Sequence, residues 1–199
     1  MLIIALAHSA HANTGYAHVH SDGHSVLRSA AGAAATLSAH AGEVVAVVPY
    51  SRLSWMRVHL PPASNGPRLQ NVLHGLLEDR LLDDPQTLHL VLDPHAETTA
   101  RTGGEVLVAV CDKQWLRDAL APLQAAGLTV QRIVPELSPT ETHVLQVMGE
   151  PDHSHSVLCH AHGVTLLPPN TAQWRAFAEL NQDDLQIQAE PAMVARVQS

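Results

Sequence analysis

The sequence predicts an α/β protein with an aliphatic core, and three observations lead to that class. Runs rich in Val, Ile and Leu recur along the chain and are short enough to be buried strands. Amphipathic stretches with helical spacing stand between them. Hydrophobic residues make up 46% of the 199 residues and aromatic residues only 3%. A chain of this length can bury one large core or two small ones.

The first fifty residues predict strands around one weak helix. Leu2–Ala7 is a short apolar strand, and residues 16–28 alternate and turn at Asp22-Gly23, a hairpin signal. The Ala-rich segment 29–42 predicts a helix that stops near Gly42. The β-branched run 43–49 then predicts a strand buried on both faces.

Residues 53–111 predict a compact α+β unit in the order strand, helix, strand, strand. The first strand alternates over 53–61, and Pro67 stands where a first helical residue belongs. The helix spans 67–84 and is ended by Pro85, with one apolar face made of Leu69, Val72, Leu73, Leu76, Leu77 and Leu81. The runs "TLHLVLD" and "EVLVAVC" supply the other two strands.

The remainder predicts two helix–strand steps and a hairpin. Asp112 can cap a helix that ends at Gly127, and Pro122 should kink this helix or end its first part early. The strand "LTVQRIVP" follows it. The capping box at Ser138–Glu141 predicts a short helix to about Met148. Beyond it we expect a hairpin in "SVLCHAHGVTLLPP", a capped helix in "NTAQWRAFAELN" and a polar, poorly periodic tail.

Charge and cysteine content exclude some functions and favour others. A net charge of −8 argues against nucleic-acid binding and suits a basic partner surface. Cys111 and Cys159 each adjoin an apolar run, which predicts buried, reduced thiols. The opening "MLIIALAHSAHA" lacks a basic start and predicts a strand rather than a secretory signal. No apolar run approaches the roughly 20 residues that span a bilayer, so a soluble chain is expected.

Five residues at the end of the 67–84 helix form the candidate partner-binding site. They are Glu78, Asp79, Arg80, Asp83 and Asp84. Carboxylates oppose the helix dipole at a C-terminus, so the cluster is either plain solvated surface or a patch that meets basic residues of a partner.

Fifteen histidines raise the alternative of a metal protein. The densest groups are His18-x-His20 with His24, and His153-x-His155 with His160-x-His162. An H-x-H pair on a strand can chelate zinc or copper, but no further ligand stands at a recognisable spacing. Histidines without a catalytic role are therefore favoured, and we expect no metal and no cofactor.

The motifs of common enzymes are missing from the sequence. There is no G-x-S-x-G elbow and no glycine-rich phosphate loop of either standard type. The turns "HSAHANTG" and "HAHG", which could hold phosphate in an actin-like ATPase, contain no Asp. We therefore expect no catalytic residues and no enzyme activity.

Three segments in this order resemble the cytoplasmic part of type II secretion system protein L. They are "GEVVAVVPYSRLSWMRVHLPP", "RLQNVLHGLLEDRLLDDPQTLHLVLDP" and "VLVAVCDKQWLRDALAPLQAAGLTVQRIVPE". The resemblance runs from about residue 16 to 169. It implies an actin-like, ribonuclease-H-like architecture with a degenerate nucleotide site. The implied parts are 1–50 in the first half, 51–111 as an inserted subdomain, 112–150 as the return and link, and 151–199 as an incomplete second half.

The same resemblance implies a function without catalysis. Members of the family dock the N-terminal domain of the secretion ATPase, protein E, at the cytoplasmic side of the bacterial inner membrane. Further implied partners are proteins M and F and a second copy of the chain. Membrane attachment would run through a segment absent from this chain. The alternative is an actin-like nucleotide-binding protein of pilus assembly.

Overall fold

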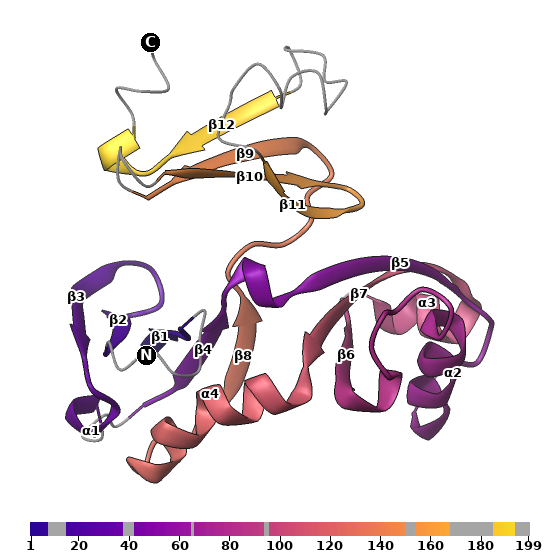
Figure 1. Cartoon of the computed structure of the whole chain (residues 1–199), viewed down its shortest axis with the longest axis horizontal. Helices are drawn as coiled ribbons and strands as arrows, with labels where there is room; N and C mark the ends of the chain where they lie inside the picture. The colour runs from indigo at the N-terminus through magenta and orange to yellow at the C-terminus, as the bar shows by residue number, and fades with distance from the viewer. Residues whose placement is uncertain are drawn as a thin grey trace. The chain divides into compact units, whose positions relative to one another are not determined.

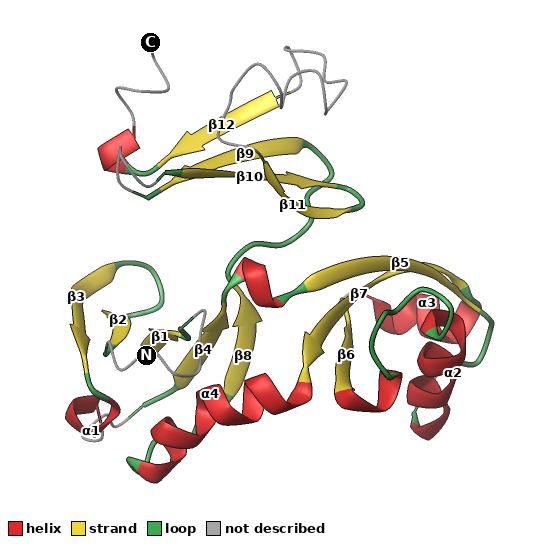
Figure 2. Cartoon of the chain, viewed as in Figure 1, coloured by secondary structure: helices red, strands yellow, loops and turns green. Residues whose placement is uncertain are grey.

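The computed structural model describes residues 1–7, 15–37, 42–64, 66–93, 96–149, 154–167 and 185–193. Its contacts divide the chain into two compact units, Met1–Glu136 and Leu137–Ser199. The elements of each unit are labelled in Figure 1 and coloured by type in Figure 2. The division into four parts implied by the family resemblance remains a prediction.

The first unit begins with a five-stranded sheet in the order β3-β2-β1-β4-β8. Its strands are β1 (Leu2–Ala5), β2 (Tyr16–Ser21), β3 (Val26–Gly32), β4 (Val44–Val48) and β8 (Arg132–Pro135). Strand β2 pairs antiparallel with both β3 and β1, whereas β1, β4 and β8 run parallel. The predicted hairpin and the buried strand before Pro49 are both confirmed.

Two helices contribute to the core of this sheet, α4 (Lys113–Ala125) and the short α1 (Ala34–Leu37). Leu2 and Ile4 of β1 are fully buried in the same cluster as Trp115 and Leu123 of α4. The predicted cap is confirmed, because Asp112 Oδ1 accepts from the Trp115 N–H at 2.5 Å. The helix continues through Pro122 to Ala125, so an early end there is wrong.

A second, three-stranded sheet in the order β5-β7-β6 forms a small subdomain with its own core. Its strands are β5 (Ser54–Leu60), β6 (Leu88–Leu92) and β7 (Gly104–Asp112), all antiparallel. Helix α2 (Pro67–Leu77) packs on it through Leu73 and Leu77, and helix α3 (Glu97–Thr102) through Ala100. Helix α3 lies between the predicted strands "TLHLVLD" and "EVLVAVC", where no helix was predicted.

The second unit is a four-stranded sheet in the order β11-β10-β9-β12. Its strands are β9 (His143–Met148), β10 (His155–His160), β11 (Gly163–Leu167) and β12 (Leu185–Ala189). The predicted hairpin is β10–β11, and a 3₁₀ helix, η6 (Pro191–Met193), adds Met193 to the core. The helix predicted in "NTAQWRAFAELN" lies outside the described residues.

Three stretches contain strands where the sequence predicted none. Residues 29–32 of the expected Ala-rich helix extend β3 and pair with β2. The helix expected after Ser138 is strand β9, whose Val144, Leu145 and Val147 are buried between two neighbouring strands. The tail expected to be irregular contains β12, parallel to β9. After Ser138, pairing of β9 with β10 and with the distant β12 outweighed the local helix signal.

Candidate functional site

The five residues of the candidate partner-binding site follow helix α2 rather than belonging to it. The helix ends at Leu77 instead of residue 84, and Glu78, Asp79 and Arg80 form a turn. Carboxylates at this end oppose the helix dipole, which is consistent with the early stop. We name the exposed stretch 78–84 the acidic segment.

Two of the five residues fix the shape of the acidic segment. Arg80 Nη1 donates to the carbonyl oxygen of Arg57 at 2.7 Å and so fastens the turn to β5. Asp84 Oδ1 accepts from the Gln86 N–H at 2.9 Å and caps the 3₁₀ helix η2 (Pro85–Thr87). The same small helix is held from α4, where Lys113 Nζ donates to the Gln86 carbonyl at 2.7 Å.

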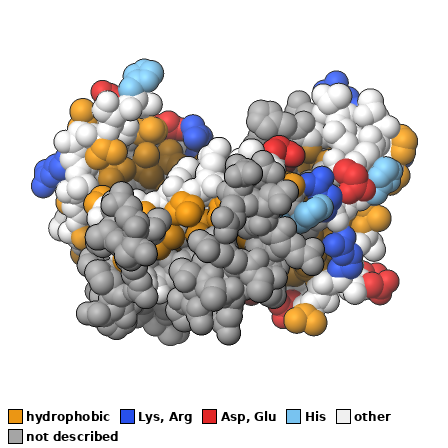
Figure 3. Space-filling model, turned by 90° about the horizontal axis from the view of Figure 1, so that it is seen from above, with side chains coloured by type: hydrophobic (Ala, Val, Ile, Leu, Met, Phe, Trp, Pro, Cys, Tyr) orange, Lys and Arg blue, Asp and Glu red, His pale blue; other side chains and the backbone are white. Residues whose placement is uncertain are grey.

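The other three carboxylates are displayed to solvent. Glu78, Asp79 and Asp83 are exposed, and no hydrogen bond or ion pair of theirs occurs within the described part of the chain. On the face seen in Figure 3, acidic and basic side chains are interspersed and do not merge into one large patch of a single charge.

Sequence reasoning missed an exposed leucine in the middle of this segment. Leu82 is 105% exposed, so its whole side chain meets solvent. The sequence could have predicted this exposure, because Leu82 lies outside the apolar helix face to which Leu77 and Leu81 belong. An exposed leucine flanked by carboxylates offers a partner both apolar area and charge.

The described histidines of the two groups that suggested a metal lie on or beside strands β2 and β10. His18 and His20 lie side by side on β2 with ring centroids 5.8 Å apart. His160 lies 6.4 Å from His143 and 6.1 Å from His162 between ring centroids, whereas His153 lies outside the described residues. Within the described ranges, no group of three or more His, Cys, Asp or Glu residues has a metal-binding arrangement.

Both cysteines are buried free thiols, as the sequence predicted. Burial raises the pKa of Cys111 to about 11, and the nearby Asp112 adds to this effect. Burial also raises the pKa of Cys159. A thiol that resists ionisation is a poor nucleophile.

Two further observations bear on function. The segment 8–14 of the first candidate phosphate turn lies outside the described residues, and the second turn simply joins β10 to β11. Among the helices of the described residues, none is both long and apolar enough to cross a membrane.

Comparison with solved structures identifies the fold. The cytoplasmic domain of EpsL, an inner membrane component of the type II secretion system of Vibrio cholerae, superposes with a TM-score of 0.65 at 21% identity. That match covers 95% of this chain and 82% of the EpsL chain. A chain of the PilM–PilN type IV pilus biogenesis complex gives a TM-score of 0.51 at 14% identity, covering 90% and 66%. The predicted actin-like α/β fold is confirmed.

Comparison of sequences identifies the family. The type II secretion system protein L of Vibrio cholerae serotype O1 is 32% identical over 94 residues, which are 47% of this chain and 21% of that protein. The aligned stretch thus spans about a fifth of the relative's length. The family model for protein L of the type II secretion system matches residues 2–149, most of the chain. The chain therefore belongs to the type II secretion system protein L family.

Proposed function

We propose that this chain is a docking scaffold of the type II secretion system that recruits the secretion ATPase, protein E, without catalysing a reaction itself. The observation that carries the proposal is the family match over residues 2–149. The similar EpsL domain is described as the cytoplasmic domain of an inner membrane component, which supports placing this chain at the cytoplasmic face of the inner membrane.

The small subdomain is the part best suited to present a docking surface. Its core is its own, with Leu60, Leu73, Leu77 and Val108 fully buried between α2 and the three strands. The hydrogen bonds of Arg80 and Asp84 tie the acidic segment to this base, and such pre-ordering reduces the entropy lost when a partner binds.

Within the acidic segment we assign different roles to the five residues. Glu78, Asp79 and Asp83 are the contacts offered to basic side chains of the N-terminal domain of protein E. Arg80 and Asp84 position the segment through their hydrogen bonds to β5 and η2. Leu82 supplies an apolar contact among them.

The further partners implied by the family are proteins M and F and a second copy of this chain. We retain them as part of the proposal, with the membrane-attached platform as their common location. The acidic segment is assigned only to protein E, because an acidic surface on an acidic chain disfavours self-association through the same patch.

A calorimetric titration against the N-terminal domain of the cognate ATPase tests the proposal. We expect saturable one-to-one binding that weakens as salt rises, because exposed charges are screened. The double variant Asp79→Lys/Asp83→Lys should weaken binding by roughly tenfold, a loss of about 1.4 kcal/mol. Both positions are exposed and neither holds the segment in place, so the variant should fold normally.

Glu141→Lys is the matched control, since Glu141 is an exposed carboxylate of the second unit. The affinity of this variant for the N-terminal domain of the ATPase should equal that of the unaltered chain. Unchanged affinity of the double variant would assign docking to another face. If no binding were seen at all and ATP with Mg²⁺ raised the melting temperature instead, the nucleotide-binding alternative would replace the docking proposal.

A further inference from the structure

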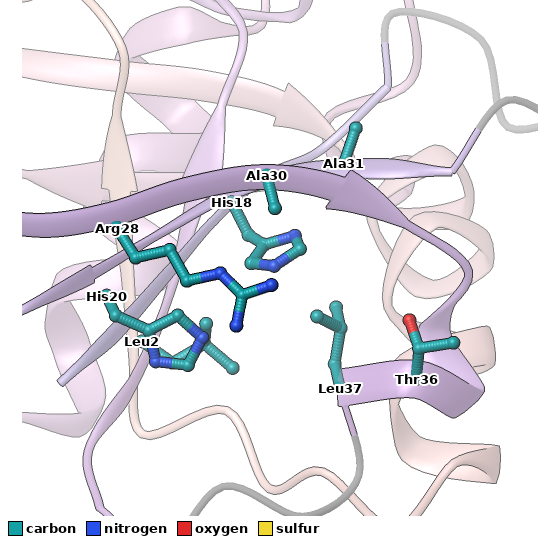
Figure 4. A pocket seen from close by; sticks show the side chains of 8 residues that line it. All are labelled: Leu2, His18, His20, Arg28, Ala30, Ala31, Thr36 and Leu37. Carbon is teal, nitrogen blue, oxygen red and sulfur yellow. The ribbon is translucent and has the colours of Figure 1, made fainter.

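A pocket on the helix-covered face of the first sheet contains three nitrogen-rich side chains. Its volume is about 280 Å³, and its walls include His18 and His20 of β2, Arg28 of β3 and Thr36 of α1, with Leu2 and Leu37 as apolar parts. Figure 4 shows the guanidinium group of Arg28 reaching toward the imidazole rings of His18 and His20. The pocket lies in the first unit and is separate from the acidic segment.

Strand register explains why these side chains share one face. His20 lies opposite Leu2 of β1 and opposite Arg28 of β3, and His18 lies opposite Ile4. Directly paired residues of neighbouring strands point to the same side of a sheet. Leu2 and Ile4 are fully buried in the core shared with α4, so both histidines and Arg28 lie on the helix-covered side.

This position is unusual for polar side chains. The hydroxyl of Tyr16, on the same face of β2, donates to the Ala119 carbonyl of α4 at 3.4 Å, which shows that the helix reaches this strand at one end. Farther along β2, the sequence places two histidines where a core would take aliphatic residues. Polar residues at core-facing positions mark functional sites in otherwise regular proteins.

The chemistry of the walls favours an anion over a metal cation. Among the described residues, no Asp or Glu lines the pocket and Arg28 has no carboxylate partner. His18 Nδ1 donates to the Tyr16 carbonyl at 3.1 Å, which leaves Nε2 to face a ligand. A metal would be repelled by the guanidinium, whereas an oxyanion would accept its paired N–H groups and favour a protonated Nε2 that donates as well.

Thr36 contributes shape and not a hydrogen bond donor. Its hydroxyl donates to the Ala33 carbonyl at 2.7 Å, inside the same short helix. Binding would therefore depend on Arg28 and the two histidines. Leu2 and Leu37 add apolar wall, which suits an ester carrying a small organic group.

We propose that this pocket binds a phosphate-type oxyanion, as free phosphate or as a phosphomonoester. Arg28 grips two of its oxygens, and His18 and His20 contact the others. Arg28 is solvent-exposed while the histidines are half-buried, so a ligand enters from solvent and meets the guanidinium first.

Histidine resonances offer a direct test. The chain is titrated with inorganic phosphate and with phenyl phosphate at constant ionic strength, and the ring C–H signals are followed by ¹H–¹³C NMR. We expect the signals of His18 and His20 to shift saturably while that of His24, at the exposed hairpin turn, stays in place. In Arg28→Gln the affinity should fall by about tenfold or more, the usual scale for a charge-assisted hydrogen bond.

Arg68→Gln is the matched control, because Arg68 is an exposed arginine on α2. It should bind phosphate like the unaltered chain. If vesicles of phosphatidic acid bind in an Arg28-dependent manner and phenyl phosphate does not, the oxyanion belongs to a lipid headgroup. Shifts that follow only ionic strength, or that persist in Arg28→Gln, would overturn the proposal, as would tighter binding of Zn²⁺ than of phosphate.

Discussion

Asp112 stands at the point where the chain passes between the two cores of the first unit. It is the last residue of β7, the central strand of the small subdomain, and it caps α4, which packs on the larger sheet. Val110 belongs to one core, whereas Cys111 and Trp115 belong to the other. The hydrogen bond from the Trp115 N–H to Asp112 Oδ1 therefore sets where the strand ends and the helix begins.

Removing this cap should destabilise the fold measurably. Asp112→Ala is expected to lower the free energy of unfolding by about 1 kcal/mol, because an N–H of the first turn loses its acceptor. Urea denaturation provides the measurement. Asp112→Asn should keep most of the stability, and Asp118→Ala, on the exposed side of the same helix, should change it by less than about 0.5 kcal/mol. An equal loss in all three variants would refute the capping role.

At the scale of elements, the β2–β3 hairpin depends on close approach of two glycines. Gly15 precedes β2, and a Cβ placed on it would lie 2.4 Å from the carbonyl carbon of Gly32 at the end of β3. Backbone atoms cannot move aside as a flexible side chain can. The hairpin can therefore close at this end only without a side chain at position 15.

Gly15→Ala should accordingly separate the ends of the two strands. We expect a loss of about 1–3 kcal/mol in the free energy of unfolding, the range of overpacking effects. Gly75→Ala is the control, because a Cβ there meets no atom within 4 Å and alanine favours a helix. That variant should gain about 0.5–1 kcal/mol. A stable Gly15→Ala variant with unchanged amide exchange in the hairpin would contradict this account.

The sequence predicted correctly those elements that are stabilised by residues close to them in the chain. The turn at Asp22-Gly23 is stabilised by its own residues, since Asp22 Oδ1 accepts from the N–H groups of His24 and Ser25 at 2.8 Å each. The cap at Asp112 was predicted for the same reason. The capping-box pattern after Ser138 predicted a helix and was wrong, because β9 pairs with β10 and with the distant β12. Pairing with β12 could not be inferred from residues 138–148 alone.

The candidate site was predicted in composition but not in shape. The acidic residues are exposed, as a partner surface requires. The hydrogen bonds of Arg80 and Asp84 to the backbone could not be inferred from the sequence, because they depend on the three-dimensional fold. Of the pocket at His18, His20 and Arg28, the sequence predicted only the H-x-H pair. Arg28 joins it through the hairpin register, which places it opposite His20.

On the scale of the whole molecule, two histidines with lowered pKa values make stability depend on pH. Burial lowers the pKa of His160, and His162 and His143 lower it further. Burial also lowers the pKa of His89, with Lys113 adding to the effect. An unfolded chain takes up these protons near the ordinary value of 6.5, whereas the folded chain resists them. Unfolding thus binds protons, so stability is retained above this pH and falls below it.

The urea midpoint should therefore decrease between pH 7.5 and pH 5.5. Circular dichroism at the two pH values measures the change. His160→Gln should reduce the difference, because glutamine does not titrate, whereas His24→Gln at the exposed turn should leave it unaltered. A midpoint that rises on acidification would show that other groups dominate the proton linkage.

The position of β8 sets an order for folding during synthesis. β4 emerges from the ribosome early, but its outer neighbour β8 follows only after the whole small subdomain has been made. The strands and helices of that subdomain are contiguous in the chain and share a core, so they can assemble first. Until Arg132–Pro135 arrive, β4 keeps one edge of backbone hydrogen bond groups open. The nascent chain therefore carries a completed small subdomain while the larger sheet is unfinished, and during this interval chaperones have an open strand edge to protect.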